Sequence, residues 1–191
     1  MKSSDQVVRC GWLTDDPIYI KYHDEEWGKP EYDSERLFEM LCLEGQQAGL
    51  SWLTILKKRS NYRNIFHEFK PYEIAQFTDQ DTQRILANAN IVRHKGKIES
   101  IIINAKCFIQ LEEDGDNFSE FIWSFVNHKP VINKWNNIKE IPTKTTESTA
   151  LSTALKKRGF KFVGPTICYA FMQACGFVND HTIDCCCYKN K

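Results

Sequence analysis

The sequence predicts an all-α fold, and three observations support this prediction. Over several segments apolar residues recur every three or four positions, which places them on one face of a helix. Residues that favour helix N-termini precede some of these segments, and glycine or proline bounds others. No alternating segment of useful strand length occurs. A chain of 191 residues is one domain of ordinary size, or one domain with a small appendage.

Three helices are predicted in the first part of the chain. Asp33 and Ser34 cap the first, an amphipathic segment that continues past residue 43. Thr78 and Asp81 resemble a capping box in front of Ile85, with aspartate in place of the usual glutamate or glutamine. The third helix has a clear apolar stripe, which comprises Ile98, Ile101, Ile102, Ala105, Phe108 and Ile109.

The second part of the chain is predicted to hold three more helices. A short helix covers residues 118–126. Residues 130–147 are polar and include two prolines, so they are expected to form a long connection. A helix over 150–158 follows, with Gly159 at its C-terminal cap. The last helix covers 165–176 and is opened by a proline.

Composition and charge narrow the possible functions. Lys plus Arg and Asp plus Glu each number 25, so no global field indicates a nucleic-acid or membrane partner. Basic residues do cluster at 57–59, 93–95 and 156–158, where a solvated helix face is the default interpretation. No segment resembles a signal peptide or reaches membrane-spanning length, which predicts a cytoplasmic protein. Eight cysteines in a reducing compartment favour thiols and metal ligands over disulfides.

Two Cys/His pairs lie at opposite ends of the chain. Cys10 and His23 are near the start, and His181 and Cys185 are near the end with the spacing H-x3-C. Zinc prefers thiolate and neutral imidazole ligands, and four of them close a tetrahedral structural site. If all four residues bind one ion, the metal joins the two ends of the domain. Spacing alone leaves open that Cys10 is a buried apolar residue and His23 a hydrogen-bonded core histidine.

The segment 159–164 is a short turn with a glycine at each end, between two predicted helices. The glycines allow the main chain to approach another molecule closely, and the helix opened by Pro165 favours an anion at its N-terminus. Lys161 and the basic run at 156–158 add positive charge. This is the plan of a helix-hairpin-helix phosphate clamp. The alternative is an ordinary αα-hairpin.

Glu44 falls on the apolar stripe of its predicted helix, in register with Leu37, Leu41 and Ala48. A carboxylate seldom points into a core unpaired, so we interpret Glu44 as part of a ligand site. If the helix ended near Gly45, Glu44 would simply be exposed. The aromatic residues that favour a flat or cationic ligand, although they could equally form plain core, are Trp12, Tyr19, Tyr22, Trp27 and Trp52.

Gly49 and Leu50 follow this helix, and Ser51 can cap the next one. Leu50 is an apolar residue where a polar residue is expected. In a soluble protein that residue can serve packing, whereas in a DNA-binding protein it can enter the space left by an extruded base.

Together these segments resemble the DNA-3-methyladenine glycosylase I family of bacterial repair enzymes. The resemblance extends from Arg9 to Tyr188. The segments that carry it are RCGW at 9–12, YHDEEWG at 22–28, LFEMLCLEGQQAGLSW at 37–52, KKRGFKFVGPTICY at 156–169, NDH at 179–181 and CCCY at 185–188.

The resemblance implies a helix-hairpin-helix glycosylase fold over a single domain, 1–191, in which residues 1–8 carry no family motif and form a loose extension. A structural zinc ion would be held by Cys10, His23, His181 and Cys185. Glu44 would be the catalytic residue of a base pocket formed with Tyr22, Trp52, Trp12, Tyr19 and Trp27. DNA would be contacted by a wedge at Gly49 and Leu50 and by a backbone clamp at Gly159, Lys161 and Gly164.

The implied activity is hydrolysis of the N-glycosidic bond of 3-methyladenine in alkylated double-stranded DNA, by a monomer without a membrane partner. The family lacks the aspartate that most helix-hairpin-helix glycosylases place after the hairpin. Asp180 lies beside His181, so we expect it to support the metal ligand or to cap a helix. Two alternatives remain open: a DNA-binding module without base chemistry, and a zinc hydrolase, which needs an open coordination position.

Overall fold

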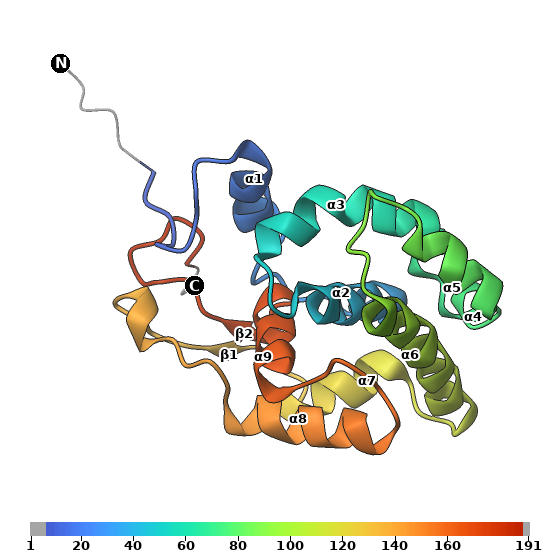
Figure 1. Ribbon diagram of the computed structural model, residues 1–191. Coiled ribbons are helices and arrows are strands. Elements are labelled where there is room, and N and C mark those ends of the chain that lie inside the picture. Colours follow the sequence, from blue (N-terminus) through green and yellow to red (C-terminus); the bar gives the residue numbers. More distant parts are fainter. Residues whose placement is uncertain (1–6, 189–191) are drawn as a thin grey trace.

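The computed structural model describes residues 7–188, and most of these are helical (Figure 1). The α-helices are α1 (Pro17–Glu25), α2 (Ser34–Gln47), α3 (Trp52–Ile65), α4 (Pro71–Ile74), α5 (Asp79–Leu86), α6 (Lys95–Glu113), α7 (Phe118–Trp123), α8 (Thr146–Lys157) and α9 (Pro165–Ala174). Short 3-10 helices are η1 (His67–Phe69), η2 (Ser124–Val126) and η3 (Ile138–Glu140), and the strands are β1 (Val131–Ile132) and β2 (Val178–Asn179). The all-α prediction is confirmed, with two very short strands added.

Helix α2 is the central element of the fold, since it packs against α3, α6, α7 and α9. Its residues Leu37, Leu41 and Leu43 are fully buried. As predicted, Asp33 caps it by accepting a hydrogen bond from the N–H of Arg36. A side chain that leaves this helix toward the core is therefore removed from bulk water unless a cavity opens beside it.

Helix ends follow their caps more closely than their apolar patterns. The capping box of α5 is confirmed, with hydrogen bonds in both directions between Thr78 and Asp81. Helix α8 starts at Thr146, earlier than predicted, because Thr145 and Ser148 form a second capping box. Serine is an unusual partner in that motif, which is why the pattern gave no signal. The helix predicted over 118–126 is confirmed as α7 continued by η2.

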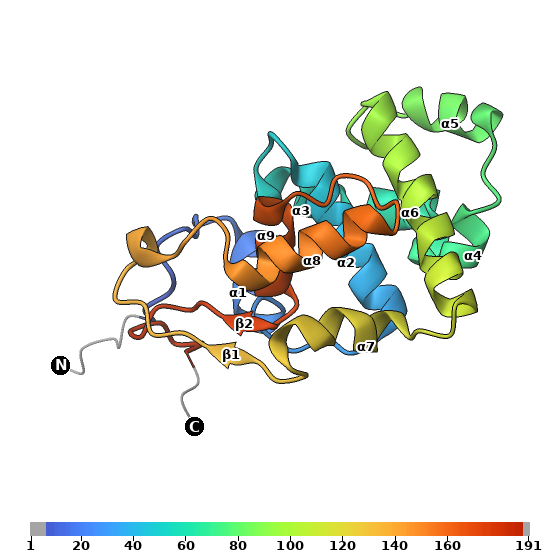
Figure 2. The same ribbon diagram turned by 90° about the horizontal axis from the view of Figure 1, so that it is seen from below.

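The long connection predicted over 130–147 contains more structure than expected. It includes η3, and β1 within it pairs in parallel with β2, with Val131 opposite Val178 (Figure 2). Strands of two residues are too short to show an alternating pattern, so the sequence could not indicate them. The pairing brings the connection against the C-terminal segment. Helix α9 ends at Ala174, and Gly176 (φ +69°) lies so close to the main chain of Lys29 that a side chain there would clash.

The N- and C-terminal segments meet at one end of the molecule (Figure 1). The N–H of Cys186 donates to the carbonyl oxygen of Val8 at 2.8 Å. The loose extension expected over 1–8 falls mainly on residues 1–6, which lie outside the described residues. None of the helices within 7–188 combines the length and apolar composition that a membrane crossing requires.

Candidate functional site

A cavity of about 320 Å³ opens among α1, α2, α3 and α9 and is closed on one side by the connection around η3. All six residues that the sequence indicated for a ligand pocket line it: Glu44, Tyr22, Trp52, Trp12, Tyr19 and Trp27. Tertiary packing thus brings together residues from the N-terminal segment and from three different helices.

Glu44 lies in this cavity as a buried and unsatisfied carboxyl group. Its side chain is on α2, which continues to Gln47, so the alternative of an exposed helix end is wrong. The residue is 3% exposed, and its Oε2 atom has no hydrogen-bond partner among the described residues. Burial raises the pKa of Glu44 to about 8, because the surroundings disfavour the charged form.

Aromatic rings form a continuous wall around this carboxyl group. The Tyr22 and Trp52 ring centroids are 5.4 Å apart, and Trp12 lies 5.0 Å from both Tyr19 and Trp27. The indole Nε1 atoms of Trp12 and Trp52 are also buried, and neither has a hydrogen-bond partner within residues 7–188. Unsatisfied buried polar atoms are rare in folded proteins. Their presence here, beside ring faces that attract positive charge, suits a flat ligand with donors and acceptors on its edge.

The cavity is also lined by six residues that the sequence did not indicate. Three belong to the connection predicted only as polar: Ile138, Ile141 and Pro142. The others, from α2 and α9, are Gln47, Ala170 and Gln173. Nothing in the pattern of residues 130–147 marks them, because an apolar residue in an irregular segment has no periodicity. For Gln47 the position three residues after Glu44 was an available signal.

The four Cys/His residues from the two chain ends also come together, and all four are buried. Their ligand atoms lie within 4.8 Å of one another. Cys10 Sγ is 3.3 Å from His181 Nδ1, and Cys185 Sγ is 3.4 Å from both His23 Nε2 and His181 Nδ1. Tetrahedral zinc with sulfur at ~2.3 Å and nitrogen at ~2.0 Å separates these atoms by roughly 3.5 Å. The residues present therefore fit a metal ion, and the apolar alternative for Cys10 and His23 does not explain their convergence.

The second nitrogen of each imidazole is also engaged. His23 Nδ1 lies 2.7 Å from an oxygen of Asp24. The Asp24 carboxylate accepts a bifurcated hydrogen bond from the Nε–H of Arg9 and a second hydrogen bond from its Nη2 atom. His181 Nε2 lies 3.2 Å from the carbonyl oxygen of Trp27. Such outer contacts fix ring orientation and tautomer in metal sites. The contact to Trp27 links the four Cys/His residues directly to the wall of the aromatic cavity.

Asp180 has neither of the two roles expected for it, because among the described residues its side chain bonds neither to His181 nor to the N-terminus of a helix. Its carboxylate is completely buried and accepts four hydrogen bonds, at 2.6 to 2.8 Å. The donors are Asn133, Trp135, Tyr169 and Gln173. Asp180 therefore ties the C-terminal segment to α9 and to the 130–147 connection. Through Gln173 it also fixes a side chain that lines the cavity.

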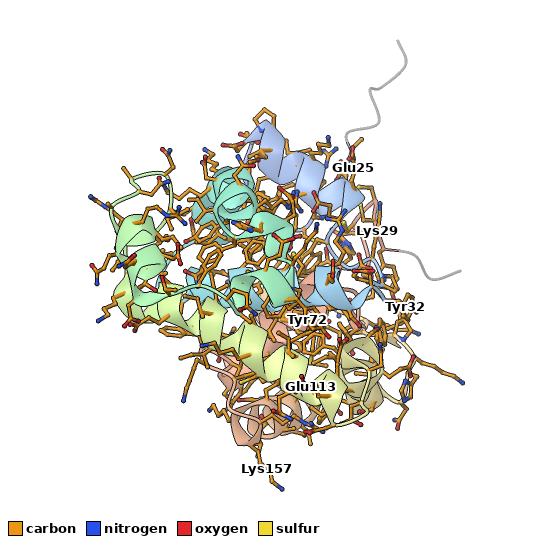
Figure 3. The ribbon with its side chains drawn as sticks, turned by 90° about the vertical axis from the view of Figure 1, so that its right-hand side faces the viewer. Glu25, Lys29, Tyr32, Tyr72, Glu113 and Lys157 are labelled. Atoms are coloured by element: carbon orange, nitrogen blue, oxygen red, sulfur yellow. The ribbon has the colours of Figure 1, made fainter. Side chains whose placement is uncertain are left out.

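Helices α8 and α9 form a hairpin around the predicted turn at 159–164. Gly159 has φ +93°, and Phe162 adopts φ +54° despite its side chain. The turn is held from within by the hydroxyl of Ser152, which donates to the carbonyl oxygen of Val163 at 2.6 Å. Lys161 is exposed, and Lys157 points away from the end of α8 into solvent (Figure 3).

The segment between α2 and α3 presents an apolar side chain to solvent. Gly49 has φ +76°, and Leu50 is 42% exposed. Ser51 caps α3, as predicted, by accepting a hydrogen bond from the N–H of Thr54. This tip follows Gln47 and precedes Trp52 in the chain, and both of those residues line the cavity.

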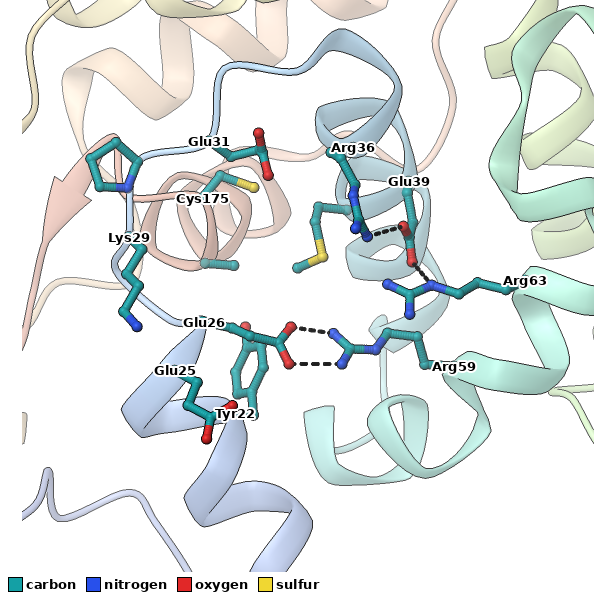
Figure 4. A pocket seen from close by; sticks show the side chains of 13 residues that line it. Tyr22, Glu25, Glu26, Lys29, Glu31, Arg36, Glu39, Arg59, Arg63 and Cys175 are labelled. Atoms are coloured by element: carbon teal, nitrogen blue, oxygen red, sulfur yellow. Dashed lines mark hydrogen bonds and ion pairs between the residues drawn. The ribbon is translucent and has the colours of Figure 1, made fainter.

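A second cavity of about 370 Å³ shares Tyr22 with the first and is lined by ion pairs (Figure 4). Arg59 on α3 makes a bidentate pair with Glu26, at 2.6 and 2.9 Å. Arg63 donates to Glu39 on α2 at 2.7 Å. The Glu26–Arg59 pair joins the end of the helix that carries Tyr22 to the helix that begins with Trp52.

The chain is similar to known proteins over nearly its whole length. The chain matches the family model described as methyladenine glycosylase over residues 12–188. It is 61% identical over 185 residues to the DNA-3-methyladenine glycosylase 1 of Escherichia coli (strain K12), covering 97% of this chain and 99% of that relative. A crystal structure of a 3-methyladenine DNA glycosylase I superposes with a TM-score of 0.94 at 57% identity, covering 95% of this chain and 100% of that one. A structure on 3-methyladenine recognition by the Staphylococcus aureus 3-methyladenine DNA glycosylase I gives a TM-score of 0.92 at 42% identity, covering 96% and 97%.

Proposed function

The chain belongs to the methyladenine glycosylase family, and from this premise we propose how its residues perform the reaction. The protein is a DNA repair glycosylase that hydrolyses the N-glycosidic bond of 3-methyladenine in alkylated DNA. The products are the free base and an abasic site. The observation that carries our assignment of residues is the buried carboxyl group of Glu44, unpaired at Oε2 in a cavity walled by aromatic rings.

In this proposal the cavity receives the extruded base. Glu44 accepts hydrogen bonds from the adenine edge, and Tyr22 and Trp52 stack on the ring. Trp12, Tyr19 and Trp27 complete the aromatic wall. A methylated adenine carries positive charge in DNA, so ring faces and a carboxylate favour it over neutral adenine. Discrimination would therefore be by charge and by shape.

The chemical step needs little help from the protein in this reading. A positively charged base is already a good leaving group, and water attacks the sugar carbon as positive charge develops there. Of the described residues that line the cavity, none is a lysine, so no amine lies there to form a covalent adduct with the sugar. This supports a monofunctional glycosylase that does not cut the DNA strand.

We assign a structural zinc ion to Cys10, His23, His181 and Cys185. Four Cys and His ligands complete a tetrahedral shell, which leaves no position for a substrate or an activating water. When bound, the ion supplies cross-linking of the chain ends and no part of the bond cleavage. The alternative of a zinc hydrolase is disfavoured for that reason.

Double-stranded DNA would be held by two segments of a helix-hairpin-helix fold. Gly49 and Leu50 form the wedge that fills the space left by the base. Gly159, Lys161 and Gly164 form the backbone clamp, where main-chain N–H groups and a cation suit a phosphate. In this proposal the enzyme acts as a monomer. None of the eight cysteines forms a disulfide, which suits the reducing cytoplasm that we propose as the location of the enzyme.

The decisive experiment is release of free base from methylated duplex DNA by the wild type and by Glu44→Gln, with both proteins checked for folding by circular dichroism. We expect the wild type to release 3-methyladenine and the variant to lose at least tenfold in turnover, because a neutral amide supplies one acceptor and no charge, worth ~1.5–3 kcal/mol. Unchanged release by Glu44→Gln would remove Glu44 from the site. No release by the wild type would leave only a DNA-binding module.

A further inference from the structure

Helix α6 carries three buried polar side chains that the proposed reaction does not use; Ser100 donates to the carbonyl oxygen of Lys97 within the helix, whereas Lys97 and Asn104 bond outside it. Lys97 is 6% exposed and Asn104 is 1% exposed. They are about two helical turns apart, so both lie on the same face of the helix. Each of them bonds to the main chain of one of the two segments to which we assign DNA contacts.

Lys97 holds the segment that ends in the wedge. Its ammonium group donates to the carbonyl oxygen of Gln46 at 2.8 Å and to that of Ala48 at 2.6 Å. The side chain of Gln46 in turn donates to the carbonyl oxygen of Lys97 at 2.9 Å. The last carbonyl groups of a helix lack partners within it and carry partial negative charge. Among the described residues no carboxylate forms an ion pair with Lys97, and burial lowers its pKa.

Asn104 holds the turn of the hairpin in the same way. Its Oδ1 atom accepts from the N–H of Lys161 at 2.7 Å, and its Nδ2 atom donates to the carbonyl oxygen of the same residue at 3.1 Å. A single amide therefore satisfies both main-chain groups of Lys161. The bonds also support the strained residue that follows, since Phe162 has a positive φ.

The two held segments touch each other beside α6. Gly45, near the end of α2, lies against Phe162, so closely that an added Cβ atom would be 3.1 Å from the Cβ atom of Phe162. The wedge packs less closely: apart from its chain neighbours, no described residue lies within 4 Å of a Cβ atom built on Gly49, and Leu50 is 42% exposed. The N–H of Leu50 donates to the carbonyl oxygen of Gln47 at 2.7 Å, so the position of Leu50 depends on the end of α2 that Lys97 holds.

We propose that Lys97 and Asn104 are positioning residues that fix the separation between the wedge at Leu50 and the backbone clamp at 159–164. Helix α6 then acts as a rigid spacer. Leu50 enters the duplex at a set distance from the phosphates that the clamp holds. This inference rests on the proposed DNA-binding role of both segments, and it deepens that role by naming what aligns them.

The test separates binding of DNA from binding of the free base. Lys97→Met keeps the length of the side chain and removes its charge and hydrogen bonds. We expect the KM for methylated duplex DNA to rise about tenfold, since hydrogen bonds to a charged donor are lost. The Kd for free 3-methyladenine, followed by tryptophan fluorescence, should stay within about twofold, because neither residue lines the cavity. Lys97→Arg should recover part of the loss, and Asn104→Leu should show the same split.

Lys58→Met is the matched control, because Lys58 also donates to a main-chain oxygen, that of Ala89 at 3.4 Å, but at the surface. It should leave both constants unchanged. A double variant tests whether Lys97 acts through Leu50. The KM for methylated duplex DNA of Lys97→Met combined with Leu50→Ala should be no higher than that of Leu50→Ala alone.

Three outcomes overturn the inference: an unchanged KM in Lys97→Met, an equal loss of affinity for DNA and for free base, or additive losses in the double variant. If Lys97→Met does not fold, the same outcomes in Asn104→Leu, alone and combined with Leu50→Ala, decide. Failure of the proposed wedge is distinguishable, because Leu50→Ala alone would then leave the KM for duplex DNA unchanged.

Discussion

At the scale of single residues, Glu44 is a buried carboxyl group whose Oε2 atom has no hydrogen-bond partner among the described residues. A carboxyl group with a pKa of about 8 is largely protonated at neutral pH in the free protein. A cationic base in the cavity would draw the group toward its ionised form, because an opposite charge nearby lowers the pKa of an acid. Burial of the Glu44 carboxyl group costs free energy in the free protein, and a ligand that pairs with this group recovers part of that cost on binding.

This burial predicts a pH dependence of stability. The pKa of Glu44 is raised from 4.5 in the unfolded chain to about 8 in the folded one. The contribution of Glu44 is therefore most favourable below pH 4.5 and is lost as the pH rises toward 8, in total by a few kcal/mol. We expect the free energy of unfolding of the wild type, measured with urea relative to Glu44→Gln, to fall between about pH 5 and pH 8.5. Taking the difference between the two proteins cancels the titration of other groups. An equal difference at both pH values would contradict the assigned environment of Glu44.

At the scale of elements, helix α1 is short and is joined to α3 at both of its ends. Asp16, its N-cap, pairs with Lys57 at 2.6 Å, and Glu26, its C-cap, pairs with Arg59. The first pair is largely exposed, whereas the Arg59 side chain is only 15% exposed and its pair is bidentate (Figure 4). Exposed ion pairs contribute little, so the second pair should dominate the placement of Tyr22 opposite Trp52.

We predict that Arg59→Glu lowers the affinity for free 3-methyladenine about tenfold, since it places like charges between the helices that carry the stacking rings. Lys57→Glu is the matched reversal on the exposed pair and should change the affinity less than about twofold. The double reversal Glu26→Arg with Arg59→Glu should recover part of the loss. Isothermal titration with the free base measures all four proteins. Equal effects of the two single reversals would show that the bidentate Glu26–Arg59 pair has no special role.

At the scale of the whole molecule, the Cys/His cluster is what closes the chain on itself. Cys10 and His181 are 171 positions apart in sequence and in direct contact. An ion bound by these four residues would stabilise the folded chain by its binding free energy, because the unfolded chain has no preformed site for it. Because His181 also contacts Trp27 in the cavity wall, the cluster stabilises the pocket as well as the termini.

Removal of the metal should therefore act on stability more than on chemistry. We expect Cys185→Ser, or treatment with a strong chelator, to lower Tm by about 10 °C or more. Turnover measured well below the new Tm should fall only a few-fold. Elemental analysis should find one zinc per chain in freshly purified wild type. Absence of bound zinc from that protein, or a variant as stable as the wild type, would refute the structural role.

The sequence by itself determined the features that depend on near neighbours. Helix caps such as Asp33 and Thr78 act within one turn, and the apolar register that buries Glu44 is a property of α2 alone. The four Cys and His residues could also be predicted as potential zinc ligands from the sequence, since few types of side chain bind zinc. In each case the physical interaction spans a few residues or follows from the chemistry of one side chain.

Only the tertiary structure decided which distant residues share a surface. Ile138 and Pro142 close the cavity from a segment without periodicity, and Asp180 bonds to α9 where its position beside His181 had suggested the metal. Lys97 was unremarkable in sequence, yet it holds the end of α2. These contacts depend on how whole elements pack. A polar side chain bonds to water until packing excludes water from around it, and its partner within the protein is then whichever polar group lies nearby.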